Sequence, residues 1–184
     1  MTESKKLSIT EIKKALKTYD KEALISILVD CYKQSQDVKN YIHVLLNPDE
    51  AIEALYRKSK NQILNEFFPE RGFAKLRLSV AKKAITEFKN LSNDELRTID
   101  LMIYYVEMGV EFTNAYGDID AQFYGSMISM YGSVIKKIEG KAGLYNQFNQ
   151  RLEEIVGNTQ EMGWGFHDEL ACLFGELIAE FEVD

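Results

Sequence analysis

The sequence SNDELRTIDLMIYYVEMGVEFTN, residues 92–114, decides the fold of this chain. Its apolar residues recur at helical spacing and form two stripes: Ile99, Met102, Ile103, Val106 and Val110, and then Leu101, Tyr105, Met108 and Phe112. A narrow polar strip separates the stripes: Asp100, Glu107, Glu111 and Asn114. A helix that is apolar around most of its circumference lies inside a protein. We therefore expect residues 92–114 to form a buried central helix whose carboxylates share one seam.

The rest of the chain repeats the helical period of about 3.6 residues, and no segment alternates convincingly as a strand does. Ser8 with Glu11 and Ser92 with Glu95 have the spacing of capping boxes, and Asp20 is placed to cap another helix. Most of the helical segments are joined by short turns, which favours antiparallel neighbours. The sequence predicts an all-α fold, an irregular antiparallel array of about nine helices with loosely recurring helix pairs.

Charged residues are distributed unevenly along the chain. Residues 1–91 carry 17 Lys and Arg against 12 Asp and Glu, whereas residues 92–184 carry 5 against 17. The best candidate for a boundary is the Pro-Glu-Arg-Gly stretch that begins at Pro69. We predict a basic N-terminal helical subdomain (1–69) and an acidic C-terminal subdomain (70–184) that packs round the 92–114 helix.

Composition and motifs narrow the class of protein. No apolar run approaches the ~18 residues that a membrane span needs, and the N-terminus does not resemble a signal peptide. Cys31 and Cys172 fall on apolar helix faces, so we expect buried free thiols in a reducing compartment. The chain contains no P-loop, Rossmann glycine fingerprint, nucleophile elbow or paired-cysteine zinc spacing. A soluble, cytoplasmic protein without a membrane partner is expected.

The seam of the central helix supplies the candidate ligand pocket. Glu107 and Glu111 are one turn apart on the same face, and Asn114 continues their line. If the last helix packs on the central one, His167 would approach these acids. The candidate pocket residues are Glu107, Glu111, Asn114, Asp118, Asp120, Trp164, His167 and Asp168. Such a cluster suits a divalent metal ion held by Glu107, Glu111 and His167, or a general acid–base site. The alternative is a structural hydrogen-bonded network.

Two further features have more than one interpretation. Trp164 lies between two glycines, where it lines a pocket or plugs the end of the helical array. A basic patch follows Pro69 and meets either phosphate or the acidic half of the chain: Arg71, Lys75, Arg77, Lys82 and Lys83. Few side chains here are placed to read or stack on bases, so nucleic acid is not the expected partner.

Several segments carry a resemblance to a known family. They are Tyr104–Asn114, Tyr116–Asp120, Gly163–Asp168, Asn47-Pro48 and Lys75–Ser79. Together they resemble an uncharacterised bacterial family catalogued only as a domain of unknown function. The resemblance implies a bacterial, cytoplasmic, helical protein, and it implies no activity, substrate or catalytic residues.

We therefore expect a non-catalytic protein-interaction or scaffold module, without a cofactor, that binds an unknown protein partner or itself through a groove between helices. Small-molecule or divalent-metal binding at the Glu/His/Asp cluster, with or without catalysis, is the alternative. Weak nucleic-acid binding through the basic half is a second alternative.

Overall fold

The computed structural model describes residues 7–181, and within that range it is all-helical, as predicted. Nine helices and no strand occur in this part of the chain. They are α1 (Ile9–Leu16), α2 (Lys21–Gln34), α3 (Gln36–Leu46), α4 (Pro48–Phe67), α5 (Leu78–Ser92), α6 (Glu95–Tyr116), α7 (Ala121–Ile138), α8 (Ala142–Gly157) and α9 (Phe166–Phe181). No helix among these combines the length and apolar character that crossing a membrane requires.

The chain divides into two compact units, residues 1–51 and 52–184. The division lies inside α4, ahead of the boundary expected at Pro69. Most of α4 belongs to the second unit because Ile63 and Phe67 are buried there with α5 and α6. In the first unit, by contrast, α1, α2 and α3 bury no residue at all.

Helix α6 is the buried centre of the second unit. Ile99 and Val106 have no exposed surface, and Met108 is only 5% exposed, so the prediction of a central helix is confirmed. Both apolar stripes find neighbours, since α6 packs against α5, α7 and α8. Gly109 lets α7 come close, because a Cβ atom there would lie 2.5 Å from the Met127 sulfur.

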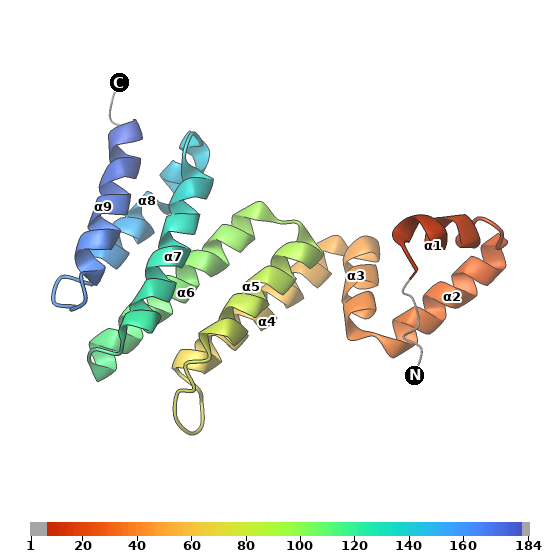
Figure 1. Cartoon of the computed structure of the whole chain (residues 1–184), viewed down its shortest axis with the longest axis horizontal. Coiled ribbons are helices and arrows are strands. Elements are labelled where there is room, and N and C mark those ends of the chain that lie inside the picture. The colour runs from red at the N-terminus through yellow and green to blue at the C-terminus, as the bar shows by residue number, and fades with distance from the viewer. Residues whose placement is uncertain (1–6, 182–184) are drawn as a thin grey trace. The chain divides into compact units, whose positions relative to one another are not determined.

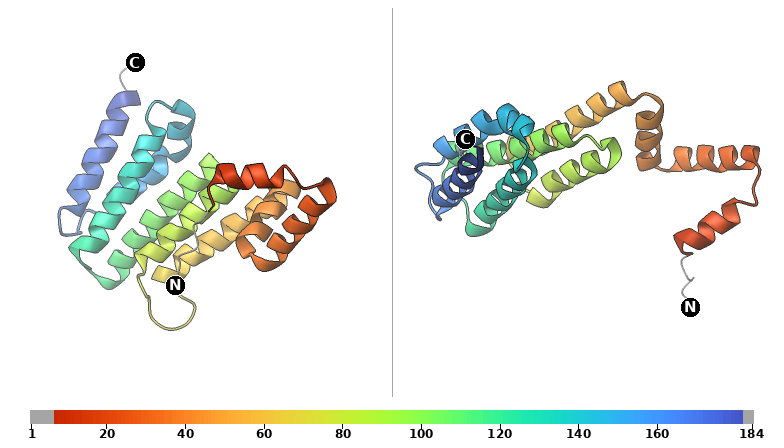
Figure 2. Two further views of the ribbon diagram at one scale, coloured as in Figure 1. Left: turned by 45° about the vertical axis from the view of Figure 1, so that its right-hand side comes forward. Right: turned by 90° about the horizontal axis from the view of Figure 1, so that it is seen from above.

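The helices of the second unit alternate between two layers. Figure 2 (right) shows α4, α6 and α8 on one side and α5, α7 and α9 on the other, and Figure 1 shows α7 beside α9. The packing of α6 on α8 and of α7 on α9 agrees with this arrangement. Helix α6 thus packs against α8 in its own layer and against α5 and α7 in the other.

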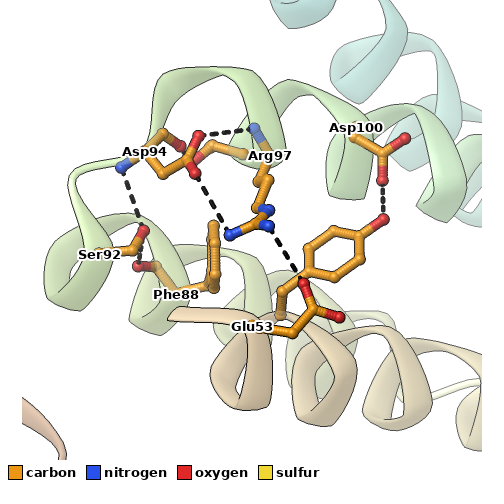
Figure 3. Close-up of polar contacts among 8 residues, drawn as sticks. Glu53, Phe88, Ser92, Asp94, Arg97 and Asp100 are labelled. Carbon is orange, nitrogen blue, oxygen red and sulfur yellow. Dashed lines mark hydrogen bonds and ion pairs between the residues drawn. The ribbon is translucent and has the colours of Figure 1, made fainter. Parts of the chain in front are cut away.

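The start of α6 differs from the prediction. Asp94, not Ser92, is the N-cap, and its carboxylate accepts the Arg97 N–H at 2.9 Å. Ser92 ends α5 instead, where its hydroxyl donates to the Phe88 carbonyl at 2.9 Å (Figure 3). The Arg97 guanidinium then reaches Glu53 of α4 at 3.1 Å. The capping predictions for Ser8 with Glu11 and for Asp20 are confirmed.

The predicted burial of the two thiols is wrong, because Cys31 and Cys172 are both exposed and unpaired. Cys31 belongs to α2, which has no buried face. The buried positions of α9 include Leu170 and Phe174. Cys172 lies two residues from each of them, so it points to the opposite side of the helix.

Candidate functional site

The carboxylates of the α6 seam are engaged by an arginine from α8. The Arg151 guanidinium donates to both oxygens of Glu107, each at 2.8 Å, and also to Asp100. The Tyr56 hydroxyl of α4 donates to the other oxygen of Asp100. This network joins α4, α6 and α8. It matches the structural hydrogen-bonded network that was the alternative to a ligand site, because the bidentate pair with Arg151 uses both oxygens of Glu107.

The electrostatics of the seam follow from this pairing. Burial opposes the positive charge of Arg151, but the hydrogen bonds and attraction from Glu107 and Asp100 outweigh it, so the Arg151 pKa is raised. Burial, followed by the Asp100 hydrogen bond, raises the Tyr56 pKa. Glu111 lies one helical turn after Glu107 on α6. Its pKa is raised by burial and then by repulsion from Glu107.

Only part of the predicted pocket assembles. Glu107, Glu111 and Asn114 line one small cavity of about 150 Å³, together with Arg151. His167 does not line this cavity, because α9 packs against α7 and α8. The Nδ1 atom of His167 lies 3.0 Å from the Thr159 hydroxyl instead. Among residues 7–181 no group of three or more His, Cys, Asp or Glu side chains is placed to hold a metal ion. The structure thus does not bring the proposed ligands together.

Asp118 and Asp120 have structural partners. The Asp118 carboxylate accepts the Tyr124 hydroxyl at 2.6 Å and the Gly163 N–H at 3.4 Å. A Cβ atom at position 163 would lie 2.9 Å from this carboxylate, which explains the glycine. Asp120 caps α7 and accepts the Phe123 N–H at 2.8 Å.

The remaining candidates lie at the surface. Trp164 is 62% exposed and has a positive φ of 63°, so it does not plug the end of the array as one interpretation had it. Asp168 is exposed in the first turn of α9. Neither belongs to the seam cavity.

A different site forms where α4 ends, α6 ends and the loop between α4 and α5 crosses them. We name it the aromatic pocket. Its volume is about 480 Å³, and its walls include Phe67, Phe68, Phe73, Phe112 and Tyr116. Three of these rings pack on one another, with centroids 5.8 Å apart for Phe68 and Phe112 and 4.6 Å apart for Phe112 and Tyr116. At its mouth Phe73 is 95% exposed and Tyr116 is 69% exposed. An apolar hollow with exposed aromatic rings is suited to receiving an apolar group.

A second, polar cavity adjoins the aromatic pocket. We name it the basic cavity. It has a volume of about 660 Å³ and includes Arg77, Lys82, Ser79 and Ser126 in its lining. Leu76 and Ile119 line both cavities. Two members of the predicted basic patch, Arg77 and Lys82, thus belong to this site, whereas Lys83 pairs with Glu87 at 3.4 Å.

Buried Glu66 fixes the loop between these cavities. Its carboxylate receives the Arg77 guanidinium at 2.7 and 3.0 Å and the Arg77 N–H at 3.1 Å. Its carbonyl accepts the N–H groups of Lys75 and Leu76. The Arg77 hydrogen bond, acting against burial, holds the Glu66 pKa below its ordinary value. One acid at the end of α4 thereby positions the residues that separate the two cavities.

Comparison with known proteins gives a family but no activity. A model described as a family of unknown function, DUF6155, matches residues 7–179. The chain belongs to this family. No curated protein and no solved structure matches it. The resemblance expected from the sequence motifs is therefore confirmed, and both cavities lie within the DUF6155 match.

Sequence reasoning missed the aromatic pocket and Arg151, although each left a signal. Phe68 and Phe73 flank the Pro69–Gly72 stretch, which has no helical period, so nothing local would bury them. Arg151 lies on the face of α8 that carries buried Phe148 and Ile155, three residues before it and four after it. A charge on an apolar helix face calls for an opposite charge across the interface.

Proposed function

We propose that this chain is a non-catalytic protein-interaction module whose aromatic pocket receives an apolar side chain of a partner. The observation that carries the proposal is the exposure of Phe73 at the mouth of a hollow with aromatic walls. A phenylalanine that stays in water lacks the stabilising free energy of about 1.5–3 kcal/mol that full burial would give. A bound apolar group would recover part of that free energy by covering the ring.

The first unit supports the same role. Its helices α1, α2 and α3 have amphipathic sequences but no buried residue, and large apolar side chains such as Ile9, Leu28 and Tyr41 are exposed. Short helices of this kind gain most of their stability by packing an apolar face against another surface. A protein partner or a second copy of the chain would provide that surface.

The alternative, a small-molecule or metal site at the seam, has weaker support. Glu107 already binds Arg151 through both oxygens, and Asp118 and His167 bind other partners. We also infer a bacterial, cytoplasmic protein. The exposed, unpaired Cys31 and Cys172 are compatible with a reducing compartment, and the motif resemblance implies a bacterial source.

A random-peptide display selection on the purified protein tests the proposal, with affinities of the selected peptides measured by fluorescence anisotropy. The selected peptides should share an aromatic or aliphatic anchor. Phe73→Ala should weaken their binding by at least about tenfold, because the anchor loses one wall of its pocket. Its fold should not change, since the side chain is almost fully exposed.

Leu96→Ala is the matched control, because Leu96 is an exposed apolar residue that does not line the pocket. It should bind the peptides as the wild-type protein does. If no peptide is enriched, or if the enriched peptides bind Phe73→Ala as tightly as wild type, the proposed function is wrong.

A further inference from the structure

We propose that the partner segment is acidic beside its apolar anchor, and that the basic cavity takes its carboxylate. This inference rests on the proposed function, because it assigns the chemistry of the segment that occupies the aromatic pocket.

The two cavities adjoin. Leu76 and Ile119 belong to the walls of both, so a bound chain that leaves the aromatic pocket across these two residues meets the basic cavity next. Leu76 has a positive φ of 48°, which is uncommon for a residue that is not glycine. Two backbone hydrogen bonds to the Glu66 carbonyl hold it and Lys75 in place. Such strain persists only where surrounding contacts enforce it, and it gathers at functional sites.

The free charge around this surface is positive. Arg71, Lys75 and Lys82 form no ion pair within residues 7–181. Glu66 balances the charge of Arg77, and Asp120, which also lines the basic cavity, caps α7 by accepting the Phe123 N–H. Glu70 is the one acid of the loop between α4 and α5. Lys82 of the cavity lining, together with Arg71 and Lys75 of the neighbouring loop, therefore supplies the positive charge with which a partner's carboxylate would pair.

The N-terminus of α5 adds to the positive electrostatic potential at the basic cavity. Its N-cap, Arg77, makes no side-chain capping bond, and the first turn carries no acid. Helix N-termini hold a partial positive charge that capping acids normally offset. Ser79 and Lys82 of α5 line the cavity at this end. A purely ionic ligand would leave the aromatic pocket empty, so a segment with both an apolar and an acidic side chain fits the whole surface best.

The test compares the selected peptides with versions in which Asp or Glu is replaced by Asn or Gln. The acidic peptides should bind wild-type protein about fivefold more tightly than the amide versions. Lys82→Gln should remove that difference. Lys83→Gln, the neighbouring residue with the same change of net charge, should retain it, because Lys83 does not line the cavity.

Two results would overturn the inference. Peptides that depend on Phe73 but are neutral or basic, and that bind Lys82→Gln unchanged, would refute the acidic segment and leave the proposed function standing. Acid-dependent binding that Phe73→Ala leaves intact would show that the two cavities do not act on one ligand. The absence of any Phe73-dependent peptide would instead refute the proposed function itself.

Discussion

At the scale of single residues, Glu66 organises the candidate site. It is 4% exposed, and its charge is tolerated because the Arg77 guanidinium and main chain surround it with hydrogen bonds. Charge-assisted bonds of this kind are stronger than neutral ones. The loop that carries Phe73 begins and ends at this pair, so the shape of the aromatic pocket depends on it.

Glu66→Gln should lower the free energy of unfolding by about 2 kcal/mol at neutral pH. The substitution should also weaken the dependence of the unfolding free energy on pH in the acidic range. The pKa of Glu66 lies below its ordinary value of 4.5 in the folded protein, so its stabilisation is complete above that value and is lost as the pH falls through the lowered folded pKa. Urea unfolding at a series of acidic and neutral pH values, followed by circular dichroism, measures both effects.

Glu87→Gln provides the comparison, because it removes an exposed carboxylate that pairs only with Lys83. Exposed pairs contribute little, so this variant should follow the wild-type pH profile. A profile for Glu66→Gln as steep as that of wild type would contradict the assigned role of Glu66.

At the scale of elements, α6 is held by apolar contact on its stripes and by charge along its seam. Arg151 bridges Asp100 and Glu107, and Tyr56 extends the bridge to α4. The side chains of Arg151, Asp100 and Glu107 are between a fifth and a third exposed, so water screens them only partly. The seam therefore sets how α8 lies against α6.

Arg151→Gln should destabilise the protein by about 2 kcal/mol, since it leaves two half-buried carboxylates facing each other without a cation. Arg57→Gln is the matched variant, because its pair with Glu53 is an exposed contact within one helix. That variant should change the unfolding free energy by no more than about 0.5 kcal/mol. Equal losses of unfolding free energy in the two variants, measured by urea unfolding, would show that the seam contributes no more to stability than a surface ion pair.

At the scale of the whole molecule, all buried positions between residues 7 and 181 lie in the second unit. In the first unit α2 contacts α3, but none of the unit's described residues is buried. Burial of apolar surface is the main source of folding stability, so the two units contribute very unequally.

Removal of residues 1–46, which leaves Asn47 in place ahead of α4, should therefore preserve a cooperative thermal transition. The midpoint should shift by no more than about 5 °C, because no described residue in the deleted segment is buried. Calorimetry and circular dichroism check this. Loss of the transition would mean that the first unit supplies part of the core.

Periodicity alone predicted the all-α class, the burial of Ile99 and Val106, and the helix that begins at Phe166, because each depends on spacing within one segment. The partner of Glu107 could not be predicted, since Arg151 lies 44 residues away and only tertiary packing brings it close. The exposed side of Cys172 was missed for a similar reason. The flanking apolar residues suggested a buried face, but the packed side is set by Leu170 and Phe174.

We place partner recognition at the end of α4 and the loop that follows it, and not at the acidic seam of α6. Titrating an isotope-labelled sample with the tightest selected peptide, and mapping the backbone amide shifts by NMR, distinguishes these two positions. The shifts should cluster at residues 67–76 and 112–119, with little change around Arg151. Shifts centred on Glu107, Glu111 and Arg151, with Phe73 and its neighbours unmoved, would contradict the account.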